Sequence, residues 1–225
     1  MNLESLCHEL LLDVYLFLST VHLFRAFRGL DARFNTLIFN HVRTYGHFDF
    51  RSASKQDCDI IYQQHLPTII DQIISLRLSN DDATPQQIER FLSRGFTFCH
   101  FIQLQSLSLF SMYSPEIMMQ MIDDLRHLPN LDHLNLVDCY LGESRLRCKK
   151  MMNIIWSLPK LIRCHLDIFF RKYRQSFPLV HTISSSVQYL SISKHIFLLN
   201  ELNNFVQHTP NLRFLHADSI DASIT

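Results

Sequence analysis

The most regular feature of the chain is a three-point apolar pattern that recurs along its length. An apolar residue is followed by two free positions, a second apolar residue, one free position and a third apolar residue. The stretch LDHLNL is one copy, with Leu131, Leu134 and Leu136 at the three positions. The second and third positions flank a single free residue, and this alternation predicts a short strand. Successive copies start 25–31 residues apart, at Tyr45, Ile73, Leu104, Leu131, Leu161, Val187 and Leu212.

The intervals between these strands carry helix signals. Ser114 followed by Pro115 places a capping residue before a proline at the first helical position. Apolar spacing predicts helices near 54–66, 84–92, 114–125, 151–158 and 197–208, and X-Pro pairs at 128–129, 158–159 and 209–210 end three of them.

A strand plus a helix at this period is the signature of leucine-rich repeats. The sequence therefore predicts an α/β fold in which residues 43–225 form a leucine-rich-repeat solenoid, with parallel strands and outer helices in about seven irregular units. Cys139 lies three residues after Leu136, where these repeats place Asn or Cys, whereas Met112 and Phe169 depart from that pattern.

The residue between the last two apolar positions of each strand is expected to point out of the core, onto the concave surface. These residues would form one row across the sheet and would bind a substrate protein: Arg77, Ser108, Asn135, His165, Ser191 and His216. The row contains no acidic residue, so a polar or acidic segment of a partner would suit it. The alternative is a solvated row, with substrate bound by further C-terminal repeats. The chain stops soon after a strand without an evident polar cap, as a C-terminally truncated array would.

The N-terminal residues 3–39 do not fit the repeat and predict three short helices. Leu10, Leu11, Val14, Tyr15 and Leu18 give the first helix an apolar face at helical spacing. The second begins near Ser19 or Thr20 and ends at Gly29, and a third follows over 32–38. So short a segment cannot bury this much apolar surface by itself. We therefore expect an exposed apolar patch, which usually marks a partner interface.

Four stretches of this segment resemble an F-box, namely LCHELL at 6–11, VYLFL at 14–18, His22-Leu23, and LDARF at 30–34. Cys7 stands where the family has proline, and His22 where it has an acidic residue. An F-box at 1–42 followed by leucine-rich repeats is similar to the divergent F-box families of some invertebrates. The resemblance implies docking to an adaptor through positions that carry either the contact or the helix core: Leu6, Leu10, Leu11, Val14, Tyr15, Leu18 and Leu23.

What the resemblance implies is a substrate-recognition adaptor. The F-box would bind a Skp-type adaptor and through it a cullin–RING ubiquitin ligase, while the repeats hold an unidentified substrate protein. Two alternatives remain open. The N-terminal residues could only cap the first repeat, or the chain could be an interaction scaffold that never meets a ligase.

Composition adds mainly exclusions. Lys+Arg and Asp+Glu are both 21, which argues against a nucleic-acid partner, and no segment reaches the ~20 apolar residues that cross a bilayer. Scattered cysteines indicate reduced thiols in a cytoplasmic or nuclear protein. Adjacent Cys-His pairs lack the spacing of zinc sites, so we expect no enzyme, cofactor or metal. A basic run would be a solvated helix face, or a signal for an acidic partner or nuclear import: Arg145, Arg147, Lys149, Lys150, Arg171, Lys172 and Arg174.

Overall fold

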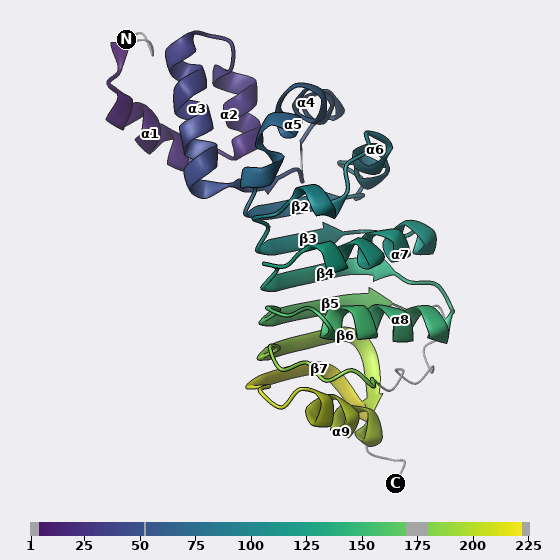
Figure 1. Ribbon diagram of the computed structural model, residues 1–225. Coiled ribbons are helices and arrows are strands. Elements are labelled where there is room, and N and C mark those ends of the chain that lie inside the picture. Colours follow the sequence, from purple (N-terminus) through teal and green to yellow (C-terminus); the bar gives the residue numbers. More distant parts are fainter. Residues whose placement is uncertain (1–4, 52, 170–179, 222–225) are drawn as a thin grey trace.

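The computed structural model describes residues 5–51, 53–169 and 180–221. Its centre is one sheet of seven parallel strands whose spatial order follows their order in the chain (Figure 1). Parallel neighbours require a crossover between strands, and helical segments supply most of these crossovers. The strands are β1 His47–Asp49, β2 Ser75–Ser79, β3 Ser106–Phe110, β4 His133–Tyr140, β5 Arg163–Phe169, β6 Tyr189–Leu198 and β7 Phe214–Asp221.

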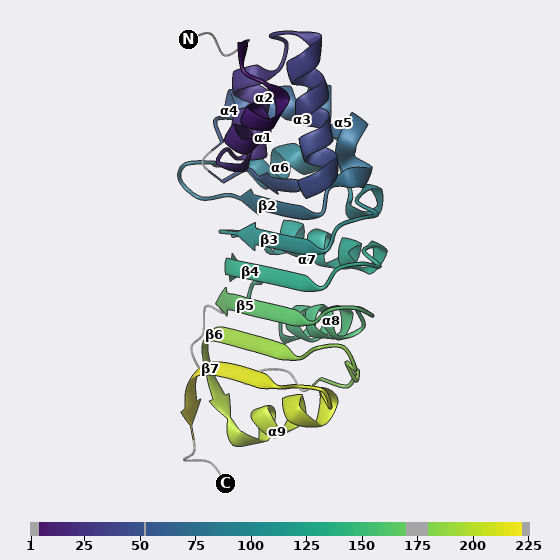
Figure 2. The ribbon, with the colours of Figure 1, turned by 90° about the vertical axis from the view of Figure 1, so that its left-hand side faces the viewer.

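Three helices precede the sheet, and the others lie between its strands in all the connections except that from β5 to β6, where the described residues contain no helix. In Figure 2 the viewer looks onto one face of the sheet, with α6, α7 and α8 behind it. Polar residues alternate with buried ones along the strands, as expected for a sheet covered by helices on one face only. The helices are α1 His8–Leu16, α2 Thr20–Phe27, α3 Ala32–Tyr45, α4 Lys55–Ile60, α5 Leu66–Ile69, α6 Gln87–Ser93, α7 Pro115–Asp124, α8 Arg145–Trp156 and α9 Leu199–His208.

The strand register agrees with the sequence prediction. Leu107 pairs with Leu134, and the neighbouring strands continue the same line of apolar residues. The residues that follow this line pair with one another in the predicted row, from Arg77 in β2 to His216 in β7. The apolar line is buried except at Leu215, which is partly buried, and it consists of Leu76, Leu107, Leu134, Cys164, Leu190 and Leu215.

The first expected repeat begins differently from the prediction. Tyr45 was expected at the first apolar position, but it is the last residue of α3 and its side chain is 42% exposed. Gly46 ends this helix in the left-handed conformation, and its N–H donates to the Val42 carbonyl at 2.7 Å. Phe48 and Phe50 do occupy buried positions. The third helix therefore runs across the expected boundary between residues 42 and 43.

Helix starts follow local capping chemistry where a serine is present. Ser54, Ser114 and Ser144 each accept a hydrogen bond from the backbone N–H three residues later. Two other starts were predicted too early. The helix expected from Thr84 begins at Gln87, and the one expected from Phe197 begins at Leu199, because Phe197 belongs to β6.

Two strands contain a residue in the left-handed conformation just beyond the row. Asp138 has φ 54° and Lys194 has φ 61°, and the register shifts at both places. The backbone N–H of each donates to an aspartate on the next strand, Asp138 to Asp167 at 3.2 Å and Lys194 to Asp218 at 2.8 Å. These aspartates therefore hold two bulges in place.

Candidate functional site

Helix α1 has two apolar faces, one buried and one exposed to solvent. Leu11 and Tyr15, four residues apart, are completely buried against α3 and its neighbours. Leu10 and Val14 have the same spacing but lie on the solvent side, 50% and 37% exposed. Burial of the first pair anchors the helix, so the second pair remains available for contact with another molecule.

The other expected adaptor positions are mostly structural. Leu23 on α2 is completely buried, whereas Leu6 and Leu18 are partly buried against the core. The Leu6 carbonyl accepts a hydrogen bond from Arg33 on α3. Of the seven residues expected at the adaptor contact, only Leu10 and Val14 present a largely exposed side chain.

Phe17 extends the exposed face of α1 and was not among the expected site residues. Its side chain is 88% exposed, and it follows Leu10 and Val14 at positions i+7 and i+3. Leu16 and Leu30 are also exposed nearby in the chain. The helical spacing of Phe17 was the signal that could have identified it. We name Leu10, Val14 and Phe17 the α1 face.

The predicted row alternates with the buried apolar line, so it lies on the opposite face of the sheet from that line. Asn135 donates from Nδ2 to Ser108 Oγ at 3.1 Å, and Ser191 Oγ lies 3.3 Å from His216 Nδ1. Ser108 is buried beside Asn135, while the other five residues of the row keep some solvent exposure. The row is therefore a polar strip from six different strands, with two hydrogen-bonded pairs of neighbours in it.

Arg77 at the start of this row is partly neutralised. Its Nη1 lies 3.4 Å from Asp49 Oδ2, and Arg51 holds the same carboxylate through two nitrogens at 2.7–3.2 Å. Burial tends to raise the pKa of Asp49, but hydrogen bonds and charge from Arg51 keep this pKa below its usual value. Two guanidinium groups share the Asp49 carboxylate, and the charge of Asp81 also acts on Arg51, so the positive charge at this end of the row is largely balanced.

An aromatic cluster lies beyond the row, next to the two bulges. Tyr140 stacks on Phe169 with ring centroids 5.2 Å apart, and Tyr113 approaches the same ring at 6.1 Å. Lys194 Nζ lies 5.7 Å from the Phe169 centroid and bridges Asp138 and Asp167 at 2.8 and 3.1 Å. Tyr113 is 53% exposed. Sequence reasoning missed this cluster, because the strand irregularity at Asp138 is what brings its members together.

The basic run near residue 145 belongs to α8 and contacts α7. Arg147 Nη2 lies 2.9 Å from Glu116 Oε1, and Lys150 Nζ lies 2.7 Å from Asp123 Oδ2. This arrangement favours the interpretation as a solvated helix face with interhelical ion pairs. Arg171, Lys172 and Arg174 lie outside the described residues.

The described histidines and cysteines bear on possible metal and thiol chemistry. Among the described residues no three His, Cys, Asp or Glu side chains are grouped so that they could hold a metal ion. Burial raises the pKa of the Cys58 thiol to about 11 and that of Cys139 to about 12, which disfavours the reactive thiolate. Cys164, in the apolar line, is buried and its pKa is likewise raised.

Within the described part of the chain, no helix combines the length and the apolar character needed to span a bilayer. Comparison of the sequence with protein-family models and with curated proteins found no match. The two surfaces described above are therefore interpreted from their own geometry.

Proposed function

We propose that this protein is a substrate-recognition adaptor of a Skp–cullin–F-box type ubiquitin ligase. Helices α1–α3 would be the F-box, and the strand–helix units would form a leucine-rich-repeat solenoid. The observation that carries the proposal is the α1 face, where Leu10, Val14 and Phe17 are exposed while Leu11 and Tyr15 are buried. Exposed apolar residues on one short helix are typical of a protein-binding surface.

The second half of the proposal concerns the substrate. The polar row from Arg77 to His216, together with the aromatic cluster of Tyr113, Tyr140 and Phe169, would hold a segment of a target protein. Rigid strands position these side chains, and aromatic residues commonly supply the central contacts of an interface. A polar or acidic segment suits the row, because none of its six residues is acidic and Arg77 is one of them.

The test is to co-express the chain with a Skp-type adaptor and to retrieve complexes through a tag on the chain. Retrieval of the adaptor together with a cullin supports the ligase assignment. Absence of both from a folded preparation would contradict it and would favour an interaction scaffold built on the same strands. Circular dichroism and a cooperative melt establish that the preparation is folded.

A further inference from the structure

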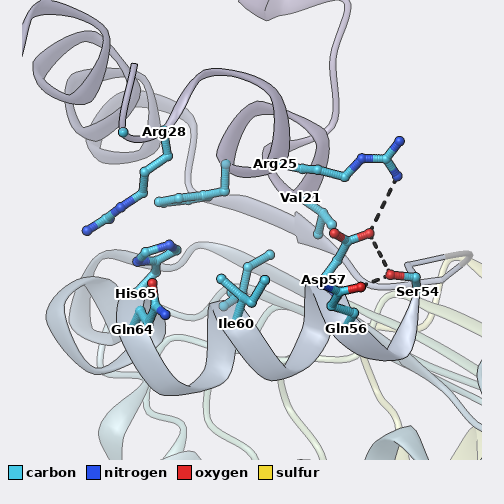
Figure 3. Close-up of a pocket in the computed structure, with 12 residues that line it drawn as sticks. Val21, Arg25, Arg28, Ser54, Gln56, Asp57, Ile60, Gln64 and His65 are labelled. Carbon is cyan, nitrogen blue, oxygen red and sulfur yellow. Dashed lines mark hydrogen bonds and ion pairs between the residues drawn. The ribbon is translucent and has the colours of Figure 1, made fainter. Parts of the chain in front are cut away.

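A cleft of about 600 Å³ lies between α2 and the helical run that starts with α4 (Figure 3). Val21 and Phe24 of α2 face Ile60 and Ile61 of the opposite run, so the middle of the cleft is apolar. Helix α3 packs against both α1 and α2, whereas α2 packs against α4 (Figure 1). The cleft is therefore separate from the α1 face, and its volume falls within the range of small-ligand sites.

At one end of the cleft the polar groups pair with one another. Arg25 Nη1 lies 3.5 Å from Asp57 Oδ2, and Ser54 Oγ donates to the same carboxylate oxygen at 2.8 Å (Figure 3). The backbone N–H of Asp57 donates in turn to Ser54 Oγ at 3.1 Å. This end has its charges paired and offers little to a ligand.

The other end contains two buried donors. Arg28 Nη1 and His65 Nδ1 are both shielded from solvent and make no hydrogen bond of good geometry among the described residues, although the backbone of Gln64 interacts with the His65 ring. His65 is only 2% exposed, and its ring stacks on Phe24 with centroids 4.7 Å apart. The Arg28 guanidinium lies 5.8 Å from the Phe24 centroid and 5.3 Å from that of Phe39, which holds it over the cleft.

The backbone explains how His65 reaches this position. Residues Ile61–His65 form a π-helical turn between α4 and α5, and the Leu66 N–H donates to the Ile61 carbonyl. Pro67 follows and has no N–H to continue a regular helix. Wider turns of this kind are rare and frequently occur at functional sites. Here the turn places an imidazole opposite the guanidinium of Arg28, the residue that follows α2.

Leaving both donors buried and unpaired is costly, and an anion would satisfy them together. A hydrogen bond to an anion is stronger than a neutral one, and the planar guanidinium suits carboxylate or phosphate oxygens. His65 can donate from Nδ1 either as the Nδ1–H tautomer or when protonated. Among the described residues Arg28 belongs to no ion pair, unlike Arg25 at the other end.

We propose that the Arg28–His65 end of the cleft binds the carboxylate or phosphate of a small organic acid, with the apolar part of that ligand over Val21 and Ile60. A small molecule is favoured over a protein segment because the cleft measures about 600 Å³ and the charges at its far end are already paired. Such a site is independent of the ligase assignment, and either could fail without the other.

The test is isothermal titration of the full chain with phenyl phosphate, inorganic phosphate and benzyl alcohol. Phenyl phosphate should bind saturably and more tightly than inorganic phosphate, and benzyl alcohol should not bind measurably. Arg28→Gln and His65→Phe should each weaken phenyl phosphate binding by about ten-fold or more. His65→Phe retains an aromatic ring beside Phe24. Arg43→Gln is the matched control, since it removes one exposed positive charge outside the cleft and should leave affinity unchanged.

Circular dichroism establishes that each variant is folded. A loss of binding can then be distinguished from a loss of structure. No saturable binding of phenyl phosphate to the folded wild-type chain would overturn the proposal. Equal weakening by Arg43→Gln and Arg28→Gln would also overturn it, because general attraction to the surface would then explain the binding. Equal affinity for inorganic and phenyl phosphate would contradict the contribution of Val21 and Ile60 to binding.

Discussion

Leu134 and Asn135 are neighbours in β4 whose side chains lie on opposite faces of the sheet. Leu134 is completely buried, while Asn135 is partly exposed and donates to Ser108. Leu134→Ala should lower the free energy of unfolding by roughly 2–5 kcal/mol, as loss of a buried leucine does. Asn135→Ala should cost about 1 kcal/mol, the usual net value of one hydrogen bond. Urea denaturation measures both, and equal losses would mean that the strand register is wrong.

His65 makes stability depend on pH. Burial, and then the charge of Arg28 just after α2, lower its pKa from 6.5 to about 4. The unfolded chain therefore binds a proton in this interval that the folded chain does not bind. Stability should fall as pH decreases from 6.5 toward 4, by at most about 3 kcal/mol for this residue. His65→Phe should reduce the pH dependence in denaturation curves, and an unchanged dependence would contradict the burial of a neutral imidazole.

The row and the cleft differ in how far sequence could predict them. The row follows from the alternation around Leu134 and Leu136, because side chains on a strand alternate between faces. The cleft depends on Arg28 and His65, which come from different helices and meet only through tertiary packing. No spacing rule connects them, so the structure was needed to bring them together.

At the scale of elements, Gly46 is the junction between α3 and β1. It has φ +53°, and an added Cβ would lie 2.7 Å from the Gln72 carbonyl oxygen and 2.9 Å from Ile74. Gly95 has φ +80° but no atom within 4 Å of an added Cβ, so it is a matched control. Gly95→Ala should cost about 1 kcal/mol from backbone strain alone. Gly46→Ala should cost a further 1–3 kcal/mol or so from the clash.

Thermal melts of the two glycine variants measure this difference. Equal destabilisation would contradict the close approach of α3 to the residues before β2. The same junction explains why the first repeat was predicted too early, since the helix continues until Gly46 and only then does the chain enter the sheet.

Most other elements were predictable because their signals are local. Serine caps and X-Pro stops fix several helix ends, including the start of α7 at Pro115. The start of α6 was not predictable in this way. Gln87 is 2% exposed, accepts from the Ser79 N–H at 2.9 Å and donates to the Phe50 carbonyl at 2.8 Å. These contacts join three separate segments, and they override the capping signal at Thr84.

At the scale of the whole molecule, the row is expected to act as one surface. Once a substrate has been identified by proximity labelling, a triple variant of Arg77, Asn135 and His165 to alanine should lose most of its capture. The corresponding control replaces Arg126, His127 and Asn203, which have the same residue types but are exposed on helical segments. Undiminished capture by the folded row variant would contradict substrate binding by the row. It would not bear on adaptor binding by the α1 face.

We propose that the α1 face binds a Skp-type adaptor. The affinities of two variants for that adaptor test this proposal. Leu10→Asp combined with Phe17→Asp places charges on exposed apolar positions without touching the core. Loss of one interface anchor commonly costs at least 2 kcal/mol, or about thirty-fold in Kd.

Leu146→Asp on α8 is the control, because Leu146 is 76% exposed outside this face. We expect wild-type affinity for the control and at least about thirty-fold weaker binding for the double variant. Wild-type affinity of a folded double variant would contradict it.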